Sequence, residues 1–251
     1  MLREDLVFGP IRSRRLGTSL GINILPTDGK VCNFDCIYCE CGWNADGRTH
    51  SAMPTAAQLR SRLEDKLAEL LLDGTTLDSI TFSGTGEPTL NPEFPRIIDD
   101  TLKLRDAYCP GVKVSVLSNA TRITDPEIRE ALRKVDNPIL KLDAPREWLA
   151  AKINRPYPGY DIRLIVDAMK LFDGDFILQT MFLRSPDFDS SDEENLTDWM
   201  DIVRSVHPRQ IMVYTIDRPT PASNLEKFSP ELMRALLTPL FDEGFNIQIR
   251  G

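Results

Sequence analysis

Short apolar runs alternate with amphipathic stretches along most of this chain. The amphipathic stretches carry apolar residues at helical spacing, as at Leu59, Leu63, Leu67 and Leu70. The apolar runs are rich in β-branched or aromatic residues and end in turn or polar residues, which is typical of buried strands. We expect six such strands, over residues 19–25, 78–83, 112–118, 138–143, 176–183 and 210–216. Strands that alternate with helices predict an α/β fold with a parallel sheet, open or curled as a partial barrel.

Helix starts are marked by capping residues. Thr55, three residues before Gln58, predicts a capping box at the start of one helix. Thr124, three residues before Glu127 and with Pro126 in the first turn, opens a second helix. Apolar residues between 196 and 206 predict a third helix, and Ser229 begins the last one.

The chain reads as one domain over residues 1–251, because no repeat, low-complexity segment or Gly/Ser linker divides it. We expect a core barrel over about residues 19–217, a short N-terminal lead-in and a C-terminal helix and strand extension. In such folds the functional residues follow the carboxyl ends of the strands. Candidate functional residues should therefore come directly after the predicted strands.

Charge and cysteine content narrow the functional classes. The net charge of −8 disfavours binding along nucleic acid, although Arg12–Arg15 forms a short basic run. No apolar run reaches the eighteen or so residues that a membrane span needs, and the charged N-terminus does not resemble a signal peptide. The chain has five cysteines, an odd number, and four of them are clustered; this argues against a disulfide framework and favours a reducing, cytoplasmic location.

Four of the five cysteines fall within ten residues, in "CNFDCIYCEC". Cys32, Cys36 and Cys39 follow a C-x3-C-x2-C spacing, with Cys41 offset from it. A zinc site normally uses four ligands in two pairs. No second pair follows, but His50 is near enough in sequence to be a ligand, so zinc remains an alternative. Three thiolates on one tight loop suit a [4Fe–4S] cluster whose fourth iron is left for a ligand from outside the protein. Cys41 should then not be a ligand.

C-x3-C-x2-C with Tyr38 before its third cysteine resembles the signature of the radical S-adenosylmethionine (SAM) enzymes. The resemblance implies a partial (β/α)6 TIM-like barrel, with Cys32, Cys36 and Cys39 holding a [4Fe–4S] cluster that binds SAM. It also implies reductive cleavage of SAM to methionine and a 5′-deoxyadenosyl radical that abstracts a hydrogen atom from the substrate. Such a reaction needs an external electron donor of the flavodoxin or ferredoxin type.

The ends of the predicted strands extend this resemblance. The turn "SGTGEP" matches the glycine-rich element of the family that contacts SAM, with threonine in place of its first glycine. Further strand ends carry "SNA" and "LDA"; Asp143 also suits a plain helix cap. By resemblance, the residues that contact SAM are Tyr38, Thr85, Gly86, Glu87, Ser118, Asn119 and Asp143.

Longer blocks from Phe8 to Ala222 resemble the group related to wyosine synthetase, which modifies guanosine 37 of tRNA(Phe). Two departures argue against that reaction here: no cysteine precedes Cys32 for a second cluster, and we expect no flavodoxin-like domain. We therefore expect a different or smaller anionic substrate, nucleotide-like or derived from RNA, while the acidic charge disfavours tRNA itself. Arginine binds such anions bidentately; the candidates are Arg14, Arg15, Arg155 and Arg218.

Lys141, two residues before Asp143, is a candidate catalytic residue. A Schiff-base role would require a lowered pKa. Two other functions remain open: an activase of a glycyl-radical enzyme, and a non-catalytic zinc or iron–sulfur module. The second would have no SAM site, so SAM cleavage distinguishes it from the enzyme.

Overall fold

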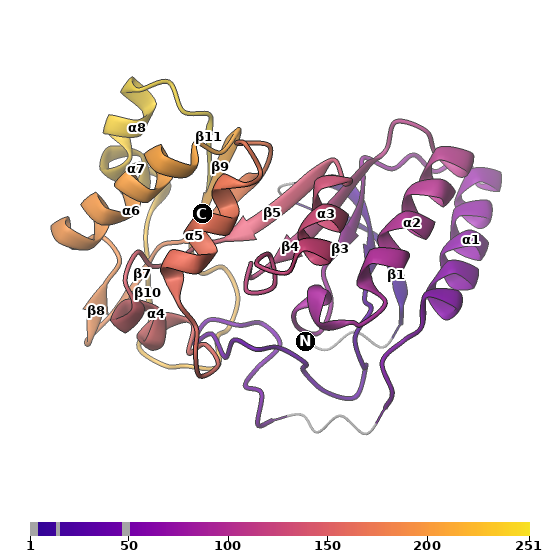
Figure 1. Cartoon of the computed structure of the whole chain (residues 1–251), viewed down its shortest axis with the longest axis horizontal. Helices are drawn as coiled ribbons and strands as arrows, with labels where there is room; N and C mark the ends of the chain where they lie inside the picture. Colours follow the sequence, from indigo (N-terminus) through magenta and orange to yellow (C-terminus); the bar gives the residue numbers. More distant parts are fainter. Residues whose placement is uncertain (1–4, 14–15, 47–50) are drawn as a thin grey trace. The chain divides into compact units, whose positions relative to one another are not determined.

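The computed structural model describes residues 5–13, 16–46 and 51–251. Two compact units divide these residues between them, and three segments of the chain contribute to each. The first unit comprises Met1–Cys32, Asn44–Ser118 and Asp125–Pro138. The second comprises Asn33–Trp43, Asn119–Thr124 and Ile139–Gly251. The predicted strand and helix order is present in both units (Figure 1).

The strands of the first unit follow the order β1-β2-β3-β4. They span Val7–Ser13, Gly17–Ile22, Ser79–Phe82 and Lys113–Ser118. The last three are parallel, and β1 is antiparallel to β2. The N-terminal lead-in thus contains a strand. The sequence did not predict it, because Gly9-Pro10 interrupts its apolar pattern. Proline is tolerated here because β1 is an edge strand and its pairing is irregular between Phe8 and Ile11.

Three α-helices and one 3-10 turn complete the first unit: α1 (Ala56–Leu72), η1 (Pro88–Leu90), α2 (Phe94–Tyr108) and α3 (Pro126–Arg133). The capping box at Thr55 and Gln58 is confirmed. The helix predicted after Thr124 is present, but Asp125 caps it by accepting a hydrogen bond from the backbone of Glu127. The cap therefore lies one residue later than predicted, next to Pro126 at the first helical position.

The second unit contains the strand order β5-β6-β9-β11, all parallel. These strands span Asn137–Lys141, Ile177–Met181, Gln210–Tyr214 and Ile247–Arg250, and the first two residues of β5 belong to the first unit. A small antiparallel sheet has the order β10-β7-β8, from Glu226–Lys227, Leu183–Ser185 and Phe188–Asp189. The helices are α4 (Glu147–Ile153), α5 (Ile162–Lys170), α6 (Glu193–Val206), α7 (Pro230–Leu236) and α8 (Thr238–Asp242).

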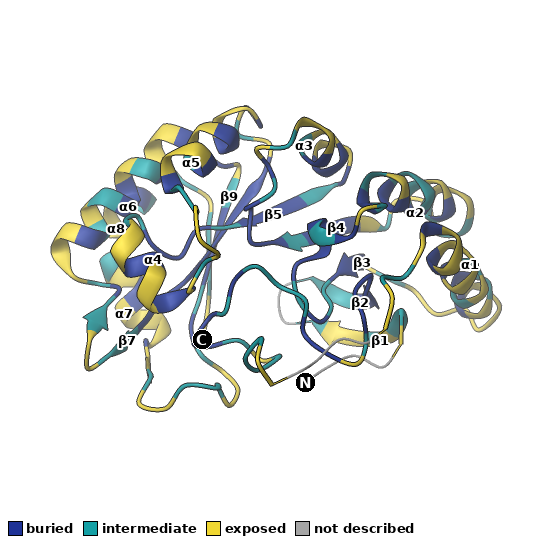
Figure 2. Cartoon of the chain, turned by 60° about the horizontal axis from the view of Figure 1, so that its bottom comes forward, coloured by how far each residue is buried: buried dark blue, intermediate teal, exposed yellow. Residues whose placement is uncertain are grey.

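Burial follows the apolar pattern of the sequence. In α1 the predicted stripe is buried on one side of the helix, and the opposite side is exposed (Figure 2). All six predicted strands are present, and five of them end one to three residues earlier than expected. Because the strands are shorter, residues such as Asp143 lie beyond the strand end. Among the described residues, no helix combines the length and hydropathy that a bilayer crossing requires.

Candidate functional site: a cysteine loop and two polar networks

In the first unit, the turn after β3 is joined to the chain that leads into Cys32. The backbone N–H of Val31 donates to the carbonyl of Thr85 at 2.9 Å, and the N–H of Glu87 donates to the carbonyl of Val31 at 3.0 Å. Gly86 lies between these bonds at φ 149°, and a Cβ on it would stand 1.8 Å from the Val31 oxygen. Only glycine therefore allows this close approach of two backbone segments.

Thr85 stands where the family has a glycine, and its side chain forms contacts within the protein. Its hydroxyl donates to the carbonyl of Pro26 at 2.8 Å and lies 3.3 Å from Oδ1 of Asn23. The same Asn23 oxygen accepts from the backbone N–H of Thr85 at 3.2 Å. Both residues are fully buried. The threonine thus fixes the turn from inside and keeps its hydroxyl away from a ligand.

Glu87 and Ser118, two predicted SAM contacts, are brought together. Oε1 of Glu87 accepts from the backbone N–H of Thr89 at 3.1 Å, from its hydroxyl at 2.6 Å, and from the Ser118 hydroxyl at 2.9 Å. Glu87 is 2% exposed, and its carboxylate caps η1. The carboxylate is therefore held in one orientation by three donors, as a preorganised binding group requires.

In the second unit, Asn33–Trp43 forms the cysteine loop, which the chain after α4 holds in place. The N–H of Asp35 donates to the carbonyl of Asn154 at 2.9 Å, and that of Ile37 donates to the carbonyl of Ile153 at 3.0 Å. In return, the N–H of Tyr157 donates to the carbonyl of Asn33 at 2.9 Å. These backbone bonds fix the loop to residues 153–157.

The cysteines are suited to hold a cluster by their chemistry. All five are thiols rather than disulfides; Cys32 belongs to the first unit, whereas Cys36, Cys39 and Cys41 belong to the second. The described residues contain no group of three His, Cys, Asp or Glu side chains gathered for a metal. Burial raises the pKa of Cys36 to about 11, although the Lys141 ammonium lowers it. A buried thiol loses its proton when iron binds, because the thiolate is the ligand.

A polar network lies beside Cys36 within the second unit. The hydroxyl of Tyr38 donates to Asp143, and Lys141 Nζ lies 2.9 Å from that hydroxyl and 2.7 Å from the hydroxyl of Tyr214. Asp143 also accepts from the backbone N–H of Met181 at 2.9 Å. Asp143 is thus not a helix cap; α4 begins later, after Arg146, with no side-chain cap. Tyr38 and Asp143 are buried, Lys141 is partly exposed, and hydrogen bonds join the three side chains in one group.

The network holds Lys141 as an ammonium. Burial alone would lower the pKa of Lys141, but the Asp143 carboxylate and the Tyr214 hydroxyl raise it above its ordinary value. The amine that attacks a carbonyl must be unprotonated. The pKa shift is therefore opposite to the one that a Schiff-base lysine requires.

Asn119, a further predicted SAM contact, is joined to the cysteine loop. Its Nδ2 donates to Oδ1 of Asn33 at 2.7 Å, and its Oδ1 accepts from the hydroxyl of Thr121 at 2.7 Å. Asn33 in turn donates to the Thr121 hydroxyl at 2.7 Å. This ring of three side chains places Asn119 directly beside the residue that follows Cys32.

The predicted substrate arginines have protein partners where the structure describes them. The Arg155 guanidinium lies 4.5 Å from the centre of the Trp43 ring, and its backbone is left-handed at φ 45°. Arg218 pairs with Glu40 at 2.5 Å, and both side chains are more than half exposed. Arg14 and Arg15, like the alternative zinc ligand His50, lie outside the described residues.

Sequence reasoning missed the amide that joins these groups. Asn154 Nδ2 lies 2.7 Å from Oδ2 of Asp143 and 3.4 Å from Sγ of Cys36. The sequence predicted a role only for the next residue, Arg155. A small polar residue at the end of a helix reads as a solvated cap, so nothing in the pattern indicated a side chain that is 3% exposed.

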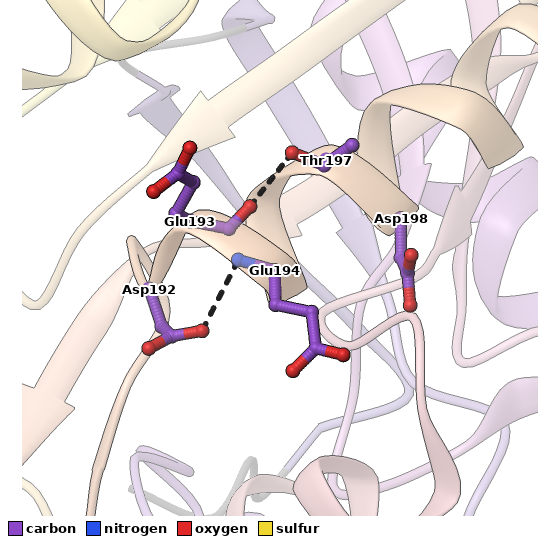
Figure 3. Close-up of a pocket in the computed structure, with 5 residues that line it drawn as sticks. All are labelled: Asp192, Glu193, Glu194, Thr197 and Asp198. Atoms are coloured by element: carbon purple, nitrogen blue, oxygen red, sulfur yellow. Dashed lines mark hydrogen bonds between the residues drawn. The ribbon is translucent and has the colours of Figure 1, made fainter.

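A pocket at the start of α6 contains none of the predicted site residues (Figure 3). It is lined by Asp192, Glu193, Glu194, Thr197 and Asp198. Asp192 caps the helix, and Arg146 binds both Glu194 and Asp198. Capping thus accounts for Asp192 and ion pairing for Glu194 and Asp198, while Glu193 lies in the first helical turn, where a negative charge is favourable.

The sequence matches the Radical SAM superfamily over residues 27–177, more than half of the chain. The chain therefore belongs to this superfamily, whose members are enzymes that bind a [4Fe–4S] cluster and SAM. The predicted α/β fold, with a parallel sheet of the superfamily's partial-barrel type, is confirmed. The enzyme class and the family's cofactors are confirmed as well.

Two bacterial relatives match most of the chain. A UPF0026 protein of Helicobacter pylori (strain J99) is 29% identical over 255 residues, covering 99% of this chain and 78% of the relative. A UPF0026 protein of Synechocystis is 31% identical over 221 residues, covering 86% of this chain and 77% of the relative.

Solved structures share the fold. A radical SAM methyltransferase from Sphaerobacter thermophilus has a TM-score of 0.68 at 17% identity, over 92% of this chain and 65% of that one. Streptococcus suis SuiB bound to SAM has a TM-score of 0.64 at 17% identity, over 92% and 50%. TYW1, a wyosine synthase, with a lysine–pyruvate adduct bound, has a TM-score of 0.61 at 15% identity, over 92% and 76%.

Proposed function

We propose that this chain cleaves SAM reductively and uses the resulting radical on an anionic substrate. The observation that carries the proposal is the cysteine motif, whose residues are thiols and whose loop is fixed by backbone bonds to residues 153–157. Cys32, Cys36 and Cys39 hold the [4Fe–4S] cluster. The cluster and SAM together supply a 5′-deoxyadenosyl radical that abstracts a hydrogen atom.

The residues of this chain bind and orient SAM. We assign its contacts to Tyr38, Thr85, Gly86, Glu87, Ser118, Asn119 and Asp143. Thr85 acts through its backbone, because its hydroxyl donates to Pro26. Glu87 offers a carboxylate that Thr89 and Ser118 already orient, which suits it to an ammonium group.

Lys141 acts as a fixed cation in this proposal. The Asp143 carboxylate raises its pKa, and two tyrosine hydroxyls hold its ammonium. It orients Tyr38 and Asp143 and supplies positive charge beside Cys36. TYW1 was solved with a lysine–pyruvate adduct, but the pKa direction of Lys141 argues against that chemistry at this lysine.

The substrate class in the proposal is a nucleotide-like or RNA-derived anion, within the group related to wyosine synthetase. Arg155 is the stronger candidate contact, because its guanidinium lies over the Trp43 ring, 4.5 Å from the ring centre, and an arginine held in this way can bind an anion through its N–H groups. Arg218 must leave Glu40 before it can bind one. Arg14 and Arg15 complete the set. The proposal includes a flavodoxin- or ferredoxin-type electron donor and a cytoplasmic location.

Anaerobic reconstitution tests the proposal. The protein is loaded with iron and sulfide, reduced with dithionite and given SAM, and 5′-deoxyadenosine is measured. Production of 5′-deoxyadenosine supports the enzyme. A well-formed cluster that neither binds nor cleaves SAM contradicts it and favours the non-catalytic iron–sulfur module.

Two cysteine variants form a matched pair for the cluster assignment. Cys36→Ser should lose the cluster, since one of three ligands is gone, whereas Cys41→Ser should keep it. Iron and sulfide content and the visible spectrum measure the difference. Loss of the cluster in Cys41→Ser alone would mean a four-cysteine site, with no iron left for SAM.

A further inference from the structure

Asn154 joins the cysteine loop to the Lys141–Asp143 pair through one side-chain amide. Its Nδ2 lies 2.7 Å from Oδ2 of Asp143, 3.4 Å from Sγ of Cys36 and 3.4 Å from the Tyr38 hydroxyl. All four residues are buried in the second unit. An amide nitrogen has two hydrogens, so one can serve the carboxylate while the other points to the sulfur and the phenol.

The backbone of Asn154 is fixed on both sides. Its N–H donates to the carbonyl of Ala150 at 2.7 Å, which closes α4, and its carbonyl accepts from Asp35 in the cysteine loop at 2.9 Å. The side chain therefore starts from a rigid position, and Asp143 holds its far end. Supporting contacts of this kind orient a metal ligand and tune its electronics.

The charges around Asn154 favour an N–H aimed at sulfur. Asp143 also accepts from the N–H of Met181, and Lys141 Nζ lies 3.7 Å from its Oδ2. With the carboxylate on one side, the amide nitrogen rather than its oxygen must face this group. The orientation of the amide is thus set by Asp143 and carried to Cys36.

We propose that Asn154 is a positioning residue that donates an N–H···S hydrogen bond to the Cys36 ligand and raises the reduction potential of the cluster. This inference rests on the proposed function. A reduced cluster carries one more negative charge, so a donor at its sulfur stabilises the reduced form more than the oxidised form.

The test measures the midpoint potential of the reconstituted cluster without substrate, for wild type, Asn154→Leu and Asn154→Gln. Asn154→Leu removes the donor and should shift the potential to more negative values, by up to about tenfold in the reduction equilibrium, or about 59 mV for one electron. Asn154→Gln retains an amide and should lie closer to wild type. The EPR spectrum of the reduced cluster should change in Asn154→Leu as well.

Phe34→Leu is the control for packing. Phe34 is 3% exposed in the same loop and packs edge-on against Tyr160, with the ring centres 5.4 Å apart. It should keep the wild-type potential. An equal shift in Phe34→Leu and Asn154→Leu would overturn the inference, because loop packing would then explain both.

The remaining outcomes of the test also support or overturn the inference about Asn154. Asn154→Leu with full iron content and the wild-type potential overturns the inference while SAM cleavage by the wild type leaves the proposed function intact. If Asn154→Leu loses its iron, Asn154→Gln and Asn154→Ser are compared instead. A potential near wild type in Asn154→Gln and a more negative one in Asn154→Ser, whose hydroxyl is too short to reach the sulfur, support the hydrogen bond; equal potentials, or loss of the cluster in both, overturn it. A wild type that binds no cluster contradicts the proposed function itself.

Discussion

Replacing Lys141 by methionine should destabilise the protein because it leaves a buried carboxylate without its cation. The Asp143 side chain is 0% exposed and that of Lys141 is 16% exposed, with Nζ and Oδ2 3.7 Å apart. Methionine has nearly the length of lysine and retains most of the packing. The variant therefore removes mainly the charge and the two hydrogen bonds to Tyr38 and Tyr214.

The magnitude follows from the separation and the burial. At an effective dielectric constant of about 20, two unit charges 3.7 Å apart attract by roughly 4.5 kcal/mol. Removing one partner of a buried pair costs about 3–5 kcal/mol. Asp143 keeps its bonds from Asn154 and Met181, which places the expected loss of unfolding free energy near ~3 kcal/mol.

The pH dependence has a definite sign. The pKa of Lys141 is raised in the folded state, where burial lowers it but Asp143 and Tyr214 raise it by more. Its stabilisation is therefore fully present below the unfolded lysine pKa of about 10.4 and declines as the pH rises toward the folded value. The gap between wild type and Lys141→Met should be the same at pH 6 and pH 9 and should narrow only in more alkaline solution.

Urea unfolding of the protein without its cluster, followed by circular dichroism, measures this gap. Lys170→Met is the matched control: Lys170 pairs with Asp167 at 2.9 Å, but the two side chains are 46% and 68% exposed. An exposed pair of this kind contributes about 0.2–1 kcal/mol. A loss below ~1 kcal/mol in Lys141→Met, or a loss no larger than in Lys170→Met, would refute the buried-pair reasoning.

Two further predictions concern the first unit. Asp136→Asn should cost about 1–3 kcal/mol of unfolding free energy at pH 7, because Asp136 accepts from the Val114 N–H at 2.9 Å and from Arg105 at 2.8 Å. Burial acts to raise the pKa of Asp136, but these donors and Lys113 lower it. The stabilisation by Asp136 is therefore present above pH ~4 and is lost as the pH falls through the folded pKa. The difference in unfolding free energy between wild type and Asp136→Asn should accordingly be smaller at pH ~3 than at pH ~7. Gly86→Ala should cost more than ~3 kcal/mol, since its Cβ would meet the Val31 oxygen at 1.8 Å. The control Gly111→Ala, with φ 89° and no atom within 4 Å of the added Cβ, should cost only about 1–2 kcal/mol; equal losses in urea unfolding would contradict the steric argument.

The parallel strands could be predicted because burial on both faces leaves continuous apolar runs in the sequence. The edge strands of the sheet were harder to predict from the sequence. β1 contains Gly9-Pro10 and is half-exposed, and β11 was expected only as part of an extension, although it pairs in parallel with β9. Edge strands bury one side at most, so their pattern is weaker and a proline is tolerated. Boundaries were wrong by up to three residues because the apolar pattern runs on past the last ladder bond.

For the candidate site, sequence predicted which residues carry chemistry but not how their polar atoms are used. Cys36, Tyr38, Lys141 and Asp143 were all named; the structure joins the last three directly in the second unit and connects Cys36 to Asp143 through Asn154. Asn154 was missed because its role depends on the meeting of two segments more than a hundred residues apart, as its contact with Cys36 spans 118 positions. Contacts at such a distance leave no periodic trace in a single sequence.

The contacts of the predicted residues restrict their chemical roles more than their residue types do. A lysine at a strand end is open to two roles, as a nucleophilic amine or as a fixed cation, and the residue type alone does not choose between them. Here Asp143 and two tyrosine hydroxyls stabilise the protonated, cationic form of Lys141. Deprotonating Lys141 would leave Asp143 with no ammonium partner in the network. The same carboxylate orients Asn154 toward Cys36. One buried acid therefore sets both the charge of Lys141 and the hydrogen bond to the cysteine, so a substitution at Asp143 should change both together.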